Sequence, residues 1–162
     1  MKKSSIEFED IIGRYLNISV ADENYRIYVE EAGKGIPLLC LHTAGSDGRQ
    51  FRHILNDKEI TKNYRVIAFD LPWHGKSNPP EGYELKDYKL TTSLYKQIIM
   101  SFCDNYKLRD PVIMGCSMGG RVVLHLALEH SNYFKAVIAL EGSDKLEPYY
   151  DLDWLYLSLI HI

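Results

Sequence analysis

Gly115-Cys116-Ser117-Met118-Gly119 is the clearest indication of the fold, because of the residues that flank it. The apolar run 111–114 is typical of a buried strand, and residues 120–130 have helical length and few helix breakers. Gly-x-Ser-x-Gly between a strand and a helix is the nucleophile-elbow pattern. Side chains at positions 115 and 119 would collide across so tight a turn, and Ser117 must take a strained backbone conformation. We therefore predict that Ser117 is a catalytic nucleophile beside the positive end of a helix.

Two alternatives to this interpretation remain open. Small residues at a strand–helix turn can serve packing alone. Cys116 is a rival nucleophile by its chemistry, although it lies one position from the apex of the turn. A half-buried cysteine usually acts as a small core hydrophobe, so Ser117 is the preferred candidate.

The rest of the chain alternates strand and helix patterns. Residues 15–20 and 25–31 are rich in β-forming residues, and polar residues typical of a turn separate them at 22–24. This pattern predicts an antiparallel hairpin. Nearly continuous apolar runs predict further strands of a parallel sheet at 36–41, 64–69 and 136–140. Polar caps predict helices from Ser46-Asp47 to about Asn56, and from Thr91 or Thr92 to Tyr106. This order predicts an α/β fold with a mostly parallel sheet, helices on both faces and an N-terminal antiparallel hairpin.

Composition limits the function classes. The chain has 162 residues, 46% of them hydrophobic, and a formal net charge of −3, which fits one domain with a core. The sequence contains no block of like charges, so it does not indicate a nucleic-acid or membrane partner. Three widely spaced cysteines (Cys40, Cys103 and Cys116) lack metal-ligand spacing and predict reduced thiols in a cytoplasmic protein. Residues 1–10 lack the apolar segment of a signal peptide, and no apolar run approaches membrane-spanning length.

Three motifs, in this order, resemble the α/β-hydrolase fold family, which includes esterases, epoxide hydrolases and C–C hydrolases. Leu41-His42-Thr43-Ala44-Gly45 is similar to the His-Gly oxyanion loop of the family. The segment 70–77 is similar to its aspartate-to-His-Gly-x-Ser segment, and the elbow is the third motif. The resemblance implies a partial α/β-hydrolase domain over residues 15–156, ending at the start of the cap, after an N-terminal extension at 1–14.

The resemblance also implies roles for particular residues. The backbone N–H groups of Ala44 and Met118 are expected to stabilise an oxyanion. Thr43 stands where the family usually has glycine, and its hydroxyl is a candidate substrate contact, as are Trp73 and His74. For the loop 70–77 as a whole, a structural role is preferred. We expect Asp70 to accept loop N–H groups, and His42 to hold its own loop by hydrogen bonds rather than act as a base.

The partners of Ser117 are harder to find in the sequence. In this fold the chain order is serine, then acid, then histidine. Glu141 and Asp144 follow the strand 136–140 and are candidate acids, with loop acids at the start of a cap region as the alternative. His125 and His130 lie on the elbow helix, which leads away from Ser117.

The end of the sequence carries a further expectation. Residues 157–162 match the translation of a transposon-end adapter used in sequencing-library preparation. We therefore expect this tail, His161 included, to be non-native, and the chain to be an N-terminal fragment that is inactive by itself.

The function implied by the resemblance is that of a serine hydrolase acting on an ester or another carbonyl-containing small molecule, in the full-length parent. No metal or organic cofactor is implied. A C–C bond hydrolase, a lyase and a cofactor-free peroxidase-like enzyme are alternatives on the same fold. A non-catalytic binding protein is the alternative from a different class.

Overall fold

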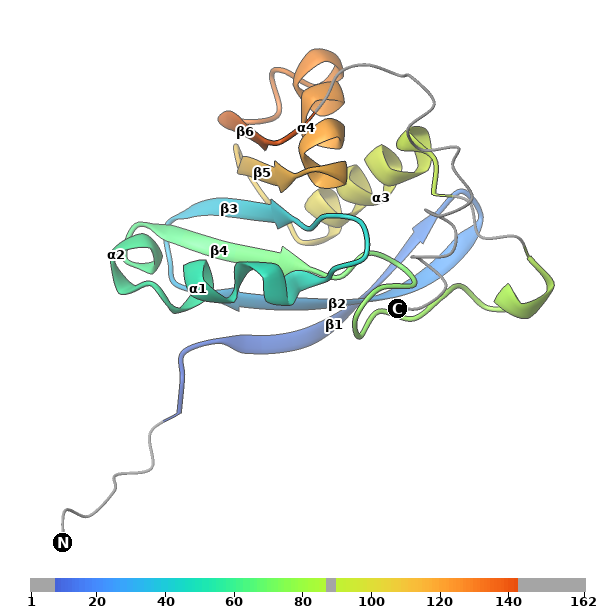
Figure 1. Cartoon of the computed structure of the whole chain (residues 1–162), viewed down its shortest axis with the longest axis horizontal. Coiled ribbons are helices and arrows are strands. Elements are labelled where there is room, and N and C mark those ends of the chain that lie inside the picture. The colour runs from blue at the N-terminus through green and yellow to red at the C-terminus, as the bar shows by residue number, and fades with distance from the viewer. Residues whose placement is uncertain (1–7, 87–89, 143–162) are drawn as a thin grey trace, which may run out of the picture.

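A mixed sheet organises the chain (Figure 1). The computed structural model describes residues 8–86 and 90–142. In this part of the chain the strand order is β1-β2-β4-β3-β5-β6. The strands are β1 (Ile12–Val20), β2 (Glu23–Ala32), β3 (Ile36–Leu41), β4 (Tyr64–Phe69), β5 (Val112–Cys116) and β6 (Ala136–Leu140). Strands β4, β3, β5 and β6 are parallel, whereas β1 and β2 pair antiparallel and β2 pairs antiparallel with β4. The predicted fold class is confirmed.

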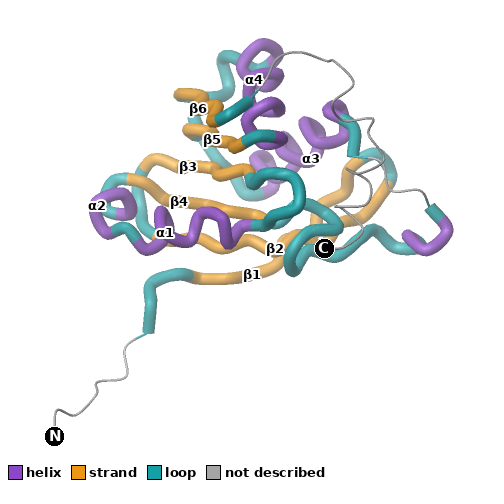
Figure 2. Tube along the Cα trace, viewed as in Figure 1, coloured by secondary structure: helices purple, strands orange, loops and turns teal. Residues whose placement is uncertain are grey.

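Helices cover both faces of this sheet, as predicted (Figure 2). One core contains Ile98 and Phe102 of α3 (Thr92–Asn105) and Val122 of α4 (Met118–Glu129). The other contains Phe51 of the 3-10 helix η1 (Gly48–Phe51) and Leu55 of α1 (Arg52–Asn56). Side chains alternate along the central strands, so each strand contributes to both cores. The remaining helical segments are α2 (Lys58–Thr61) and η2 (Tyr83–Leu85).

The N-terminal hairpin differs from the prediction at its turn. Ala21 and Asp22 both have positive φ, 50° and 62°, which is the pattern of a two-residue type I′ turn. That turn matches the twist of the flanking strands, so Glu23 pairs with Val20 within the ladder instead of lying in a loop. The first strand begins at Ile12 rather than at residue 15. The boundary predicted at 14 therefore falls inside β1.

Two helix caps agree with the sequence. The Asp47 side chain accepts a hydrogen bond from the Arg49 N–H at the start of η1, and Thr91 accepts one from the Leu94 N–H at the start of α3. The single helix predicted as far as Asn56 is divided into η1 and α1. In the described residues no helix has the length and apolarity needed to cross a membrane.

Strand β6 is the outer strand of the described sheet beyond β5. Its alternate residues are exposed, with Ile138 at 40% and Leu140 at 45%. An apolar strand with one open edge can pair with another chain. The carboxyl ends of β3 and β5, by contrast, lie side by side, since Leu41 is in register with Gly115.

Candidate active site

Ser117 occupies the junction of β5 and α4 in a conformation that L-residues rarely adopt. Its φ and ψ are 52° and −109°. The Ser117 N–H donates to the carbonyl oxygen of Leu140 at 2.8 Å, and the Ser117 carbonyl accepts from the Arg121 N–H at 2.8 Å. Residues forced into sparsely populated backbone regions cost about 1–3 kcal/mol and cluster at functional sites. The structure thus has the strained turn that the motif predicts.

The glycines of the elbow permit two close approaches. A Cβ atom on Gly115 would lie 2.3 Å from the carbonyl of Gly119, across the turn, as expected from the sequence. A Cβ atom on Gly119 would lie 2.5 Å from the carbonyl oxygen of Leu41 and 2.9 Å from that of His42. The first turn of α4 therefore packs directly against the end of β3. This contact brings the Met118 end of the helix beside the loop that carries Ala44.

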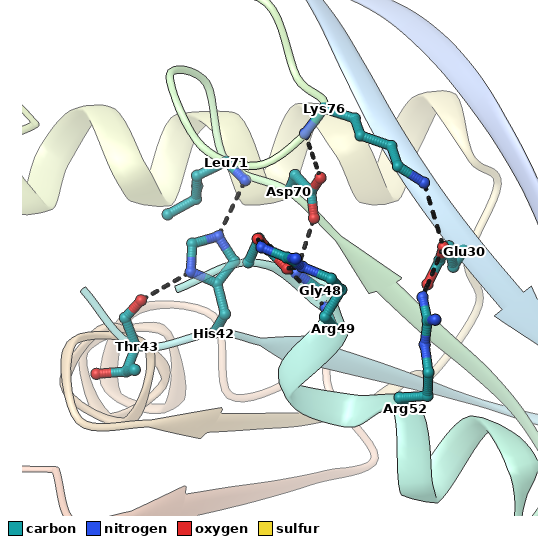
Figure 3. Close-up of polar contacts among 10 residues, drawn as sticks. Glu30, His42, Thr43, Gly48, Arg49, Arg52, Asp70, Leu71 and Lys76 are labelled. Carbon is teal, nitrogen blue, oxygen red and sulfur yellow. Dashed lines mark hydrogen bonds and ion pairs between the residues drawn. The ribbon is translucent and has the colours of Figure 1, made fainter. Parts of the chain in front are cut away.

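His42 holds that loop through both ring nitrogens (Figure 3). The Leu71 N–H donates to Nε2 at 3.1 Å, so Nε2 is an acceptor and the ring proton belongs to Nδ1. Nδ1 then donates to the Thr43 carbonyl at 2.8 Å. The side chain is 0% exposed, and burial lowers its pKa to about 4. His42 is therefore neutral near pH 7, in the structural arrangement that the sequence predicts.

Thr43 and Ala44 follow His42 in the loop after β3. The Thr43 N–H donates to Oε1 of Gln50 at 2.9 Å, and the Ser46 N–H approaches the Thr43 carbonyl at 3.3 Å. Among the described residues no hydrogen bond occupies the N–H of Ala44. The N–H of Met118 is the first of α4 and has no partner within its helix. Two backbone donors are thus available at adjacent strand ends, where the oxyanion site is predicted.

Asp70 organises the loop after β4 and is 4% exposed. Its Oδ1 accepts from the Gly48 N–H and its Oδ2 from the Lys76 N–H, each at 2.7 Å. Burial raises its pKa, while these two hydrogen bonds lower it. A Cβ atom on Gly75, where φ is +53°, would lie 2.2 Å from Oδ2. The loop role predicted for Asp70 is confirmed.

A second polar cluster joins this loop to the sheet (Figure 3). Glu30 of β2 is buried and forms ion pairs with Arg52 of α1 at 3.1 Å and with Lys76 at 3.8 Å. The Tyr28 hydroxyl donates to the same carboxylate at 3.2 Å. Arg52 and Lys76 are both about half exposed, so solvent weakens these pairs and their role is to orient the loop.

Trp73 and His74 lie in the same loop but differ in exposure. Trp73 has φ of 71°, is half-buried, and meets the Tyr83 ring edge-on at 5.1 Å between centroids. His74 is 1% exposed, its Nδ1 lies 2.9 Å from the Pro72 carbonyl, and its ring centroid lies 5.0 Å from that of His42. A substrate contact stays a prediction for Trp73, Thr43 and His74, and the burial of His74 favours a structural role for it.

Within the described residues, no hydrogen bond joins the Ser117 side chain to a candidate acid or to a histidine. Glu141 has φ of 52° and an exposed side chain, one residue after the carbonyl that receives the Ser117 N–H. Asp144 and the tail 157–162 lie outside the described residues. His125 lies on α4, about two turns beyond Ser117, and His130 is the residue that follows the end of this helix. Cys116 is half-buried at the end of β5, next to the apex and not at it.

The sequence and the fold of this chain are both similar to those of known proteins. The sequence profile of the family described as alpha/beta hydrolase fold matches residues 36–157. The chain belongs to this family. Over 120 residues the chain is 28% identical to the AB hydrolase superfamily protein YisY of Bacillus subtilis (strain 168), and the match covers 74% of the chain and 41% of YisY.

Two further proteins that are similar to this chain, one in sequence and one in fold, are esterases by name. The pimeloyl-[acyl-carrier protein] methyl ester esterase of Vibrio cholerae is 25% identical over 119 residues, which cover 74% of this chain and 42% of the esterase. The structure of a thermophilic esterase from Thermogutta terrifontis superimposes with a TM-score of 0.71 at 20% identity, covering 85% of this chain and 50% of that one. The second likeness concerns the fold alone. The chain spans half or less of the length of each relative.

Sequence reasoning missed one residue of the site, Gln50. Its side chain bonds the backbone of Thr43, although seven positions separate the two residues. No motif marks Gln50, because the contact depends on how η1 folds back over the end of β3. Only the capping signal at Asp47 indicated that a helical turn begins nearby.

Proposed function

We propose that the protein containing this alpha/beta hydrolase chain is a serine hydrolase that cleaves an ester of a small molecule. The observation that carries the proposal is the backbone of Ser117, held at φ 52° between a strand and a helix N-terminus. The strain at Ser117 destabilises the fold. A turn needed for packing alone could use glycine, which adopts this conformation without strain. A binding protein on this scaffold has no use for a strained serine.

The proposed chemistry is acyl transfer. The Ser117 Oγ attacks the carbonyl carbon of the substrate as its proton passes to a base, and the carbonyl becomes an oxyanion. The N–H groups of Ala44 and Met118 donate to that oxygen. Collapse of the tetrahedral intermediate expels the alcohol, which takes the proton from the base, and leaves an acyl–Ser117 ester. Water then hydrolyses this ester to a carboxylic acid and restores the Ser117 hydroxyl. Esters are favoured over other carbonyl compounds because the relative from Vibrio cholerae is an esterase by name.

The base is proposed to lie outside the described residues. His42 uses both ring nitrogens in hydrogen bonds, and His74 is buried, with Nδ1 on a backbone carbonyl. A catalytic base must reach the serine proton directly or through one water, and must be free to take it. His42 is not free in this sense, and the burial of His74 favours a structural role, so neither histidine is proposed as the base. Glu141 and Asp144 stay candidates for the residue that orients the base.

The test uses the 162-residue chain and, separately, the product of the reading frame that contains it. Each is treated with a fluorophosphonate probe and then with p-nitrophenyl esters of increasing acyl length, and the labelled residue is located by mass spectrometry. We expect labelling of Ser117 and turnover in the longer product, both abolished by Ser117→Ala. Cys116→Ala is the matched control for the neighbouring nucleophile and should retain labelling.

The outcomes separate the alternatives. Labelling of Ser117 without ester turnover would favour a C–C hydrolase, a lyase or a peroxidase-like enzyme on the same fold. Absence of labelling in the longer product would overturn the proposal and favour a binding protein. Loss of labelling in Cys116→Ala, with retention in Ser117→Ala, would transfer the nucleophile to Cys116.

A further inference from the structure

The N–H and the carbonyl of Thr43 each form a hydrogen bond with a side chain, one from Gln50 and one from His42. The Thr43 N–H donates to Oε1 of Gln50 at 2.9 Å, and the Thr43 carbonyl accepts from Nδ1 of His42 at 2.8 Å. Figure 3 shows the His42 ring between the Leu71 N–H and this carbonyl. The two peptide planes on either side of the Thr43 Cα are therefore both fixed.

Fixing the Thr43 carbonyl determines the direction of the next N–H. A trans peptide is planar, with its C=O and N–H pointing in opposite directions. The peptide that carries the Thr43 carbonyl also carries the Ala44 N–H. The bonds from His42 and from the Ser46 N–H set the carbonyl direction, and the bond to Gln50 restricts rotation of the preceding peptide about the Thr43 backbone. The Ala44 N–H then points away from His42.

The acceptor on Gln50 is itself anchored. Gln50 lies in η1, whose first N–H, that of Gly48, donates to the buried Asp70 at 2.7 Å. The Gln50 N–H donates to the Asp47 carbonyl at 3.0 Å, and the neighbouring Phe51 is buried in the core. These contacts fix the backbone of Gln50, although its side chain is exposed to solvent.

We infer that Gln50 is a positioning residue for the Ala44 N–H, acting through the Thr43 peptide, and so tunes stabilisation of the oxyanion. The inference rests on the proposed function. At Thr43 this chain has a side chain where the family usually has glycine, and the bond to Gln50 holds that residue in place. A purely structural role would make Gln50 matter for stability alone.

The test compares Gln50→Met, which keeps the length of the side chain and removes the acceptor, with Gln97→Met on the exposed face of α3 as the matched control. Removal of one oxyanion donor lowers kcat by 10²–10³ in known hydrolases, so loss of its orientation should lower kcat by about tenfold. The value of KM should change by less than about twofold, because the ground-state ester gains little from that donor. Gln97→Met should leave both constants unchanged.

A second measurement separates orientation from folding. Sulfur accepts hydrogen bonds weakly, so a thionoester depends less on the oxyanion donors than its oxygen ester does. We expect the ratio of oxygen-ester to thionoester kcat to fall in Gln50→Met and to stay constant in Gln97→Met. A wild-type kcat in Gln50→Met, or a reduced kcat with an unchanged ratio, would overturn the inference.

These activity measurements use the product of the reading frame that contains the chain. If its wild-type form shows no Ser117-dependent turnover, the proposed function fails, and the role of Gln50 is decided by amide exchange in 15N-labelled protein. Gln50→Met should accelerate exchange at Thr43 and shift the Ala44 amide resonance. Unchanged signals at both residues would refute the positioning role independently of any activity.

Discussion

The carbonyl oxygen of Leu140 accepts a hydrogen bond from the backbone N–H of Ser117, with 2.8 Å between nitrogen and oxygen. The end of β6 therefore holds the apex of the turn between β5 and α4. Gly120 makes this approach possible, because a Cβ atom there would lie 2.6 Å from the same oxygen. The conformation of the candidate nucleophile thus depends on a strand that follows it in the sequence.

Gly120→Ala should lower the free energy of unfolding by about 1–3 kcal/mol, since the new methyl group must displace backbone that cannot move away. Gly82→Ala is the control. Gly82 has φ of +72° but open space around its Cβ position, so that variant measures backbone strain without a clash. Urea unfolding compares the two. Equal or smaller destabilisation in Gly120→Ala would contradict the packing account.

Ser117→Gly should be more stable than Ser117→Ala by about 1 kcal/mol. Glycine tolerates the positive φ of this position, whereas alanine keeps the strain and loses the hydroxyl. Both variants should lack activity, so the comparison isolates the cost of the turn. Thermal or urea unfolding provides the measurement, and a less stable glycine variant would show that the site is unstrained.

Asp70→Asn should destabilise the fold by about 1–3 kcal/mol, because an amide has one acceptor oxygen for two backbone N–H groups, and its NH₂ would face the other donor. Asp57→Asn at the start of α2 is the matched control. Asp57 is exposed and caps a helix, a position where asparagine serves as well as aspartate. Similar stability losses in the two variants would contradict the buried-network role of Asp70.

The free energy of unfolding should fall as the pH falls from 6.5 toward 4, by up to about 3 kcal/mol from His42 alone. Its pKa is lowered to about 4 in the folded protein, and an unfolded histidine has a pKa near 6.5. Between these values the unfolded chain binds a proton that the folded state excludes, so acid favours unfolding. The pKa of His74 is also lowered by burial and acts in the same direction, whereas the raised pKa of Asp70 opposes it.

The contribution of His42 is isolated by comparing the pH dependence of wild type with that of His42→Asn. Asparagine can still donate to the Thr43 carbonyl but does not titrate. Chemical unfolding at several pH values should give a shallower dependence for the variant. Parallel curves would mean that His42 does not titrate with a lowered pKa.

Ile138→Lys should reduce self-association of the 162-residue chain. Ile138 is 40% exposed on the outer described strand, and a lysine on an edge strand opposes pairing with another chain. Light scattering during concentration provides the measurement. Val137→Lys is the comparison, because Val137 packs against the core and its replacement should destabilise the fold. Equal aggregation of Ile138→Lys and wild type would exclude the β6 edge as the contact.

Local signals predicted much of the site. The Gly-x-Ser-x-Gly pattern marked a turn whose strain the backbone of Ser117 displays, and short polar side chains marked the starts of η1 and α3 correctly. The hairpin turn was placed too late, because the twist match that favours Ala21-Asp22 is a property of the paired strands and not of turn composition. Gln50 carried no signal, since its contact joins two segments that only the folded sheet brings together.

The six strands of the described sheet, the longer helices, their α/β order and the position of the strained serine could be predicted from the sequence, because these depend on periodicity, capping and tight-turn sterics that act over a few residues. Which strand ends lie together became clear from the folded sheet. Insertion of β4 between β2 and β3, and the approach of Gly119 to Leu41, place the Ala44 loop beside the elbow. Burial then decided that His42 is neutral and holds the loop, since desolvation depends on neighbours that are distant in the chain.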